Sequence, residues 1–346
     1  MIERVQGALL GLVIRLPDRV RRPLVGAPVV IEGQELASDL QLMLRFQALS
    51  GRTPAEQRPW PEGRAELALQ SRVVGGNQPI GAVRDITIEG PGGPLPLRLY
   101  TPLSRLNDDR VPTMLFIHGG GMVYGGDHGT HDAACRFLAE QSGVQLLSVD
   151  YRLAPEHPYP AGVEDCIAAC DWMFAHTAEI DADPDRLAVG GDSAGGFFSA
   201  VVAIHAAESG RHLAFQLLVY PVTDFVNESA SRRRFNKGFF LTKEFMDRAT
   251  DAFLPDRADR ARPDVTLLSR DGFPAGLAPA LVVTAGFDPL RDEGEAYAAL
   301  LAQHGVSVET KRFPGMIHGF LNIVALGTQV PECNREIAAR VREALA

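Results

Sequence analysis

A serine stands between small residues where a strand-like apolar run gives way to a helix-like one. The segment Gly191-Asp192-Ser193-Ala194-Gly195 follows LAVG and precedes GFFSAVVAIHAA, so it fits the pattern G-x-S-x-G between a strand and a helix. Such a turn strains the serine backbone and lifts the hydroxyl above a sheet, while small neighbours let strand and helix approach. The pattern predicts nucleophilic attack by Ser193 on an acyl carbon. The alternative is a glycine-rich turn with an ordinary serine.

A second glycine motif, His118-Gly119-Gly120-Gly121, follows the apolar run MLFI. When a serine adds to a carbonyl, negative charge collects on oxygen, and each pre-aimed donor lowers the barrier by about 3 kcal/mol. Glycines keep side chains away from that oxygen, and the motif matches the HGGG element of an oxyanion hole. His118 is expected to shape the loop by hydrogen bonding rather than to transfer protons.

A nucleophilic serine needs a base, and in this architecture the chain order is serine, carboxylate, histidine. Two histidines follow the serine at a long interval: His304, at an expected helix end, and His318, in a loop after the last expected strand. His318 is therefore the candidate base. For the carboxylate we prefer Asp288, directly after LVVTAGF. Asp292 and Glu293 are rivals, which we expect in the first turn of a helix.

The elements that must position these groups alternate between strands and helices. RDITIEG and LPLRLYT flank the turn residues PGGP, which predicts an antiparallel hairpin. From TMLFIHG onward, strand-like runs alternate with helical ones, and LAPALVVTAGF and VSVETKRF are the last two expected strands. This rhythm predicts an α/β fold with a mainly parallel central sheet flanked by helices on both faces.

Two segments depart from this alternation. Residues 1 to about 75 show helical periodicity with little strand signal, and residues 225 to about 275 show some helical pattern and no clean strand. A structureless loop of about fifty residues is improbable in a compact domain, so both segments are predicted to form a helical cap over the sheet. The arginines Arg232, Arg233 and Arg234 are expected on the solvated surface of that cap. The predicted division is residues 1–75 for the N-terminal part of the cap, 76–224 for the first part of the core, 225–275 for the cap insertion and 276–346 for the second part of the core.

Composition restricts the class of partner. The 346 residues carry a formal net charge of −9 and no nucleic-acid motif, so nucleic acid is not an expected partner. Four irregularly spaced cysteines do not form a disulfide framework, which indicates the cytoplasm; Cys166 and Cys170 are expected on a buried helix face. The apolar run GALLGLVI near the N-terminus predicts an amphipathic helix and no stable membrane insertion, because it is too short to span a bilayer.

Metal and nucleotide sites are not expected. Asp127, His128, His131 and Asp132 resemble a metal cluster in composition, but we expect them at a capped helix start and assign no metal. Neither G-x-G-x-x-G nor G-x-x-x-x-G-K-[ST] occurs in the glycine-rich stretches, which disfavours nucleotide binding. Acyl transfer on a serine requires no cofactor, so none is expected.

Together these motifs resemble those of the bacterial hormone-sensitive lipase-like (family IV) carboxylesterases of the α/β-hydrolase fold. The resemblance covers about residues 75–325 through HGGG, DYRLAPEHPYPA, GDSAGG, DPLRDEG and the final HGF. It implies Ser193 as nucleophile, His318 as general base and acid, and Asp288 as the partner that orients the imidazole.

The same resemblance implies further parts of the site. Gly120, Gly121 and Ala194 would supply the N–H groups of the oxyanion hole. The likeness also implies a helical cap made from the N-terminal segment and an insertion after the strand that ends near Tyr220.

The expected activity is hydrolysis of short to medium-chain carboxylic esters, which are small-molecule substrates, through an acyl-enzyme. Cap residues that are candidates for lining the acyl pocket are Phe239, Phe240, Phe245 and Met246. Alternatives are an amidase, lactonase or peptidase on the same triad, and a non-catalytic small-molecule binder. The presence of His318 speaks against the binder, because plant hormone receptors that resemble this family lack a working histidine. A homodimer is left open.

Overall fold

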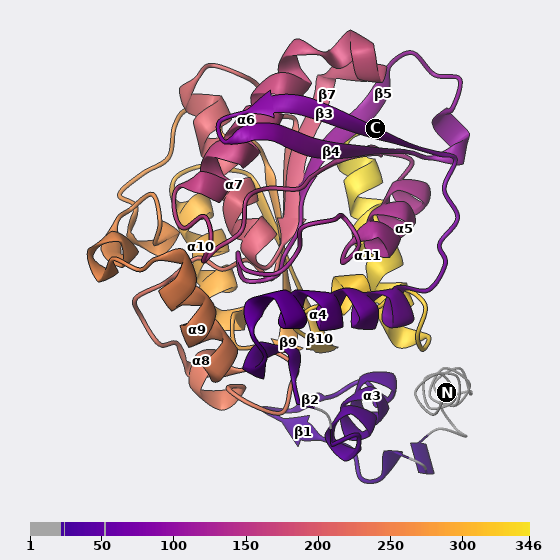
Figure 1. Ribbon diagram of the computed structural model, residues 1–346, viewed down its shortest axis with the longest axis vertical. Helices are drawn as coiled ribbons and strands as arrows, with labels where there is room; N and C mark the ends of the chain where they lie inside the picture. The colour runs from indigo at the N-terminus through magenta and orange to yellow at the C-terminus, as the bar shows by residue number, and fades with distance from the viewer. Residues whose placement is uncertain (1–21, 24, 52) are drawn as a thin grey trace.

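The chain is built around a mixed sheet, which has eight strands in the part that the computed structural model describes, residues 22–23, 25–51 and 53–346 (Figure 1). The helix predicted at the N-terminus lies outside these residues. In spatial order the strands are β10 (Val308–Ile317), β9 (Ala280–Phe287), β8 (Phe215–Val219), β7 (Ala182–Asp192), β5 (Val111–Ile117), β6 (Gln145–Val149), β4 (Gly93–Thr101) and β3 (Ala82–Gly90). β3 and β4 form the predicted antiparallel hairpin, β4 also pairs antiparallel with β6, and the other neighbouring strands are parallel. The prediction of an α/β fold with a mainly parallel sheet is confirmed.

Helices cover both faces of this sheet. Figure 1 places α6 (Ala161–Ala175), α7 (Ala194–Glu208) and α10 (Arg291–Gln303) on one side, and α5 (Asp132–Ser142) and α11 (Gln329–Ala344) on the other. The central strand β5 is buried along its whole length, and its side chains alternate between two cores. Leu115 belongs to the core beneath α6 and α7, while Met114 and Phe116 belong to the core beneath α5 and α11. A strand covered on both faces is expected to be continuously apolar, as VPTMLFI nearly is.

Short elements outside these layers come from two parts of the chain. The N-terminal part contains β1 (Val30–Ile31), β2 (Gln34–Glu35), α3 (Ser38–Leu49), η1 (Ala55–Gln57) and α4 (Trp60–Gly75). The segment after β8 contains α8 (Ala230–Arg234), α9 (Lys243–Phe253), η4 (Arg257–Ala261) and η5 (Leu267–Ser269), and residues 225–275 form no strand, as predicted. The label η marks a short 3-10 helix, and three further ones are η2 (Leu103–Arg105), η3 (Thr177–Ile180) and η6 (Phe320–Asn322). Among the described helices, none has the length and apolar character needed to cross a membrane.

Arg248 of α9 joins these two parts of the chain. Its guanidinium donates hydrogen bonds to the carbonyl oxygens of Glu56 and, at 2.9 Å, Arg58. It also lies 4.0 Å from the centroid of the Trp60 ring, within the range of a cation–π contact. The segment after β8 is therefore bound to η1 and the start of α4.

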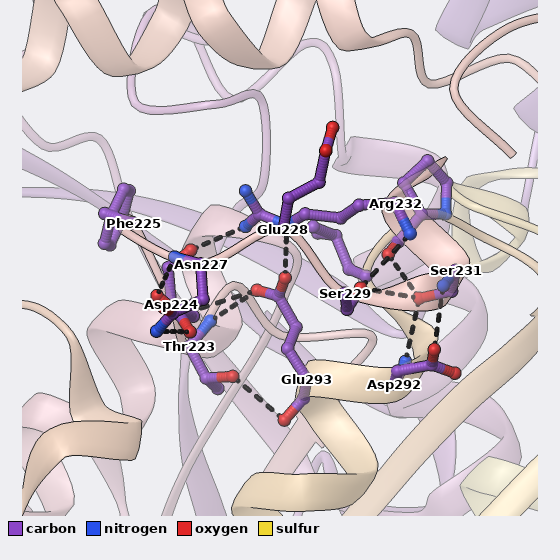
Figure 2. Close-up of polar contacts among 12 residues, drawn as sticks. Thr223, Asp224, Phe225, Asn227, Glu228, Ser229, Ser231, Arg232, Asp292 and Glu293 are labelled. Carbon is purple, nitrogen blue, oxygen red and sulfur yellow. Dashed lines mark hydrogen bonds and ion pairs between the residues drawn. The ribbon is translucent and has the colours of Figure 1, made fainter. Parts of the chain in front are cut away.

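A buried ion pair fixes the same segment to the first turn of α10 (Figure 2). Arg232 Nε donates to Glu293 Oε2 at 2.6 Å, and the two side chains are 17% and 2% exposed. The other oxygen of Glu293 accepts the N–H of Thr223 at 2.9 Å, and Arg232 Nη2 donates to the carbonyl oxygen of Asp224 at 2.6 Å. The expectation that Arg232 lies on a solvated surface is wrong, because this guanidinium neutralises a buried carboxylate.

We expect Arg232→Ala to lower the free energy of unfolding by about 3 kcal/mol, because it leaves the Glu293 carboxylate buried without its cation. Urea denaturation followed by circular dichroism measures the loss. The matched control is Arg233→Ala, since Arg233 is exposed and should change stability by no more than about 0.5 kcal/mol. Equal losses in the two variants would contradict the buried-pair interpretation.

Candidate active site

The carboxyl ends of the parallel strands meet at one edge of the sheet, and the predicted site residues follow those ends directly. Ser193 follows β7, Asp288 follows β9, His318 follows β10, and the glycine loop begins at His118 after β5. Open α/β sheets bind their ligands at this edge. The topology therefore brings together residues that lie up to 200 positions apart in the chain.

Ser193 forms the turn between β7 and α7. Its φ of +56° and ψ of −117° lie in a region that strains any residue with a Cβ. Its N–H donates to the carbonyl oxygen of Val219 at 2.8 Å. A Cβ added to Gly191 or Gly195 would stand 2.2 Å or 1.8 Å from the carbonyl oxygen of Ile117. The turn closes against the end of β5 only because both positions are glycine.

The side chains of Ser193, His318 and Asp288 form one continuous hydrogen-bonded chain. His318 Nε2 lies 2.9 Å from Ser193 Oγ, and His318 Nδ1 lies 2.9 Å from Asp288 Oδ2. Asp288 is fully buried, and its other oxygen accepts the N–H of Leu290 at 2.8 Å. A carboxylate that accepts from Nδ1–H fixes the tautomer whose Nε2 accepts the hydroxyl proton. The arrangement is able to deprotonate the serine as it attacks.

The rival residues lie elsewhere. Asp292 and Glu293 are in the first turn of α10, as expected, and Glu293 is bound by Arg232. Neither is a hydrogen-bond partner of His318 within the described residues. His304 is the C-cap residue of α10, as its position before a glycine predicted.

The glycine loop after β5 has backbone conformations that favour glycine. Gly120 and Gly121 have φ values of +120° and +62°. A Cβ on Gly120 would stand 2.3 Å from the carbonyl oxygen of Tyr124, and one on Gly121 would stand 2.8 Å from the ring of Phe245. Ala194 is the first residue of α7, where backbone N–H groups have no acceptor within the helix.

Asp192, the residue before the serine, is a buried carboxylate to which our sequence-based prediction gave no role. Its Oδ1 accepts the N–H of Gly119 at 2.9 Å and lies 3.0 Å from His131 Nε2, and its Oδ2 accepts the hydroxyl of Tyr220 at 3.3 Å. Burial alone would raise the pKa of Asp192, but His131 and the Gly119 N–H outweigh it and hold that pKa below its usual value. The sequence signal was a charged residue inside an apolar strand-to-helix junction, because a buried carboxylate needs donors.

Two histidines surround this carboxylate. His131 precedes α5 but makes no side-chain cap; its Nδ1 lies 2.8 Å from Thr130 Oγ1 and its Nε2 faces Asp192. His118 Nδ1 lies 2.7 Å from the carbonyl oxygen of Gly119, so His118 shapes the loop as predicted. Burial, together with the nearby His131, lowers the pKa of His118 to about 3, which keeps this ring neutral.

Comparison with known proteins places the chain in a family. Residues 114–322 match the family of the α/β-hydrolase fold. The chain is 39% identical, over 99% of its length and 93% of the relative's, to the carboxylic ester hydrolase LipN of Mycobacterium tuberculosis. It is 38% identical to the carboxylesterase NlhH of the same organism, over 82% of this chain and 85% of that relative.

Solved structures agree with these matches. An ester hydrolase from the Lake Arreo metagenome, in complex with a bipyridine phosphonate derivative, superposes with a TM-score of 0.85 at 39% identity, covering 89% of this chain and 98% of that one. A hyperthermophilic esterase from Pyrobaculum calidifontis superposes with a TM-score of 0.83 at 36% identity, covering 90% and 99%. The chain therefore belongs to the bacterial hormone-sensitive lipase-like carboxylesterases of the α/β-hydrolase fold, the family that its motifs resemble.

Proposed function

We propose that this enzyme hydrolyses short to medium-chain carboxylic esters through an acyl-enzyme formed on Ser193. His318 acts as general base and acid, and Asp288 orients its imidazole. The observation that carries the proposal is the unbroken chain of two 2.9 Å contacts from Ser193 Oγ through the imidazole to Asp288. The relatives named carboxylic ester hydrolase and carboxylesterase support the ester as the substrate class.

In the first half-reaction, His318 Nε2 takes the hydroxyl proton while Ser193 Oγ attacks the carbonyl carbon. The carbonyl oxygen gains negative charge, which the N–H groups of Gly120, Gly121 and Ala194 stabilise. The imidazolium then gives its proton to the departing alcohol as the C–O bond breaks. The products of this step are the free alcohol and an acyl ester on the serine.

In the second half-reaction, water replaces the alcohol. His318 removes a proton from the water as its oxygen attacks the acyl carbon, and then returns that proton to Ser193 Oγ. The carboxylic acid leaves and the enzyme regains its starting state. Every proton in the cycle moves through one imidazole, and the reaction uses no cofactor.

The proposed cap is built from the two predicted segments, residues 1–75 and 225–275, over a core of residues 76–224 and 276–346; residues 1–21, 24 and 52 of the first segment lie outside the described residues. The contacts of Arg248 with Glu56, Arg58 and Trp60 support this division, because they join the two cap segments directly.

Two aromatic side chains of the insertion lie against loops that carry proposed site residues. Phe245 lies against Gly121 of the glycine loop, and Phe240 lies against Gly319, where an added Cβ would stand 3.0 Å from its ring. Phe239 instead packs against core rings, with its centroid 5.4 Å from that of Phe287. We therefore assign Phe240 and Phe245 to the acyl pocket, where their bulk limits chain length.

A series of p-nitrophenyl esters from acetate to palmitate tests this substrate class, and we expect the highest kcat/KM with short to medium acyl chains. Phe245→Ala should raise the octanoate-to-acetate ratio of kcat/KM by about tenfold, because each methylene newly buried contributes about 0.8 kcal/mol. The control Phe273→Leu alters a ring that packs on Tyr297 and His304, and should leave the ratio unchanged.

Two results would contradict the substrate proposal. If p-nitroacetanilide or a lactone were turned over faster than every ester, the substrate class would be an amide or a lactone instead of an ester. An unchanged octanoate-to-acetate ratio of kcat/KM in Phe245→Ala would show that the Phe245 ring does not line the acyl pocket.

A further inference from the structure

Tyr220, the first residue after β8, lies beside the triad without belonging to it. It is fully buried, and its φ of +36° is unusual for a residue with a bulky side chain. Its N–H donates to the carbonyl oxygen of Val283 at 2.6 Å. Strained conformations of this kind persist only where the surroundings fix them, and they cluster at functional sites.

The ring and the hydroxyl of Tyr220 both contact the loop that carries His318. The ring centroid lies 4.6 Å from that of the imidazole, with 53° between the planes. The hydroxyl accepts the N–H of Leu321 at 3.2 Å and donates to Asp192 Oδ2 at 3.3 Å. Burial, and the nearby charge of Asp192, raise the pKa of Tyr220 well above its usual value, so this hydroxyl keeps its proton for the carboxylate.

The loop after β10 requires such support. β10 is an edge strand, and its pairing with β9 becomes irregular between Phe313 and Ile317. Gly319 then takes a left-handed φ of +78°. Asn334 Nδ2 donates to the carbonyl oxygens of Phe320 and Leu321, both at 3.2 Å. Asn334 therefore binds the carbonyl groups of this segment, while Tyr220 binds its N–H group.

We propose that Tyr220 is a positioning residue for His318: its ring supports the imidazole, and its hydroxyl ties the following backbone to Asp192, the neighbour of the nucleophile. The inference rests on the proposed function, because it takes His318 as the base. Small displacements of a base cost rate rather than substrate affinity, since the imidazole acts on the transition state.

The test is Tyr220→Phe, which keeps the ring and removes the hydroxyl. We expect kcat for p-nitrophenyl butyrate to fall about tenfold with KM unchanged, the effect of losing one hydrogen bond that aligns the base. Tyr220→Leu removes both contacts and should cost about a hundredfold. A p-nitrophenyl phosphonate should still label one serine per chain in Tyr220→Phe, but more slowly than in the wild type.

The matched control is Tyr297→Phe. Tyr297 is equally buried, and its hydroxyl has no hydrogen-bond partner among the described residues, so its kinetics should match the wild type. Wild-type kcat in Tyr220→Phe would overturn the inference. A fall in kcat that only matches the fall in the fraction of chains labelled by phosphonate would also overturn it, because the variant would then contain fewer active molecules rather than a misaligned base. Failure of the proposed function is a different result: the phosphonate would not modify Ser193 in the wild-type enzyme.

Discussion

Ser193→Ala is expected to lower kcat for p-nitrophenyl butyrate by about 10⁶-fold, because no oxygen remains to form the acyl-enzyme. The substitution removes one hydroxyl, which lies 2.9 Å from His318 Nε2, and leaves the backbone of the turn in place. The melting temperature should therefore stay close to that of the wild type. Turnover assays and mass spectrometry of phosphonate-treated protein measure the effect, and the variant should carry no adduct.

Ser209→Ala provides the comparison for this variant. Ser209 is the exposed C-cap residue at the opposite end of α7, so its substitution should preserve both turnover and labelling. If Ser193→Ala retained wild-type turnover, the nucleophile would have to be another residue, and the assignment of this turn as the reactive site would be wrong.

Asp288→Asn is expected to lower kcat by about 10⁴-fold, the scale seen when a triad carboxylate becomes an amide. An asparagine can present an N–H group toward His318 Nδ1, where the carboxylate presents only an acceptor at 2.9 Å. The imidazole then favours the tautomer with its hydrogen on Nε2, which cannot take the serine proton. Single-turnover measurement of p-nitrophenol release separates this slower chemistry from product release.

Asp292→Asn distinguishes the assigned acid from its neighbours in sequence. Asp292 Oδ2 accepts the N–H of Ser231, and Asp292 N–H donates to Ser231 Oγ (Figure 2). This variant should keep wild-type kcat while losing stability. A larger loss of kcat in Asp292→Asn than in Asp288→Asn would place the acid in the first turn of α10.

Local steric requirements explain why much of the fold was predictable. Gly191 and Gly195 are glycines because the carbonyl of Ile117 leaves no room for a Cβ, and such a requirement appears in the sequence as a motif. Strand-and-helix alternation is equally local, since each element carries its own period. The chain order of serine, carboxylate and histidine then left few candidates for the remaining site residues.

Contacts across the sheet edge were not predictable in the same way. Tyr220 and Leu321 are 101 positions apart, and Arg232 and Glu293 are 61 apart, with no local pattern that links either pair. The run of three arginines favoured the prediction of a solvated surface. The buried carboxylate that binds Arg232 lies on another element, so no neighbouring residue indicated it. Whether a charged side chain is buried can be predicted only when its ion-pair partner is known, and the sequence does not show which residues pair.

The wide sequence separation between the proposed nucleophile and the proposed base has a consequence for folding kinetics. The contact between Ser193 and His318 closes 125 residues of chain, and it requires β7, β8, β9 and β10 to have paired in register. Loops of this size form slowly, because their entropic cost precedes any stabilising contact. During refolding, helical signal should therefore return well before hydrolysis does. If His318 is the base, as we propose, a nascent chain that does not yet include β10 carries Ser193 without its proton acceptor, and we expect it to be inert.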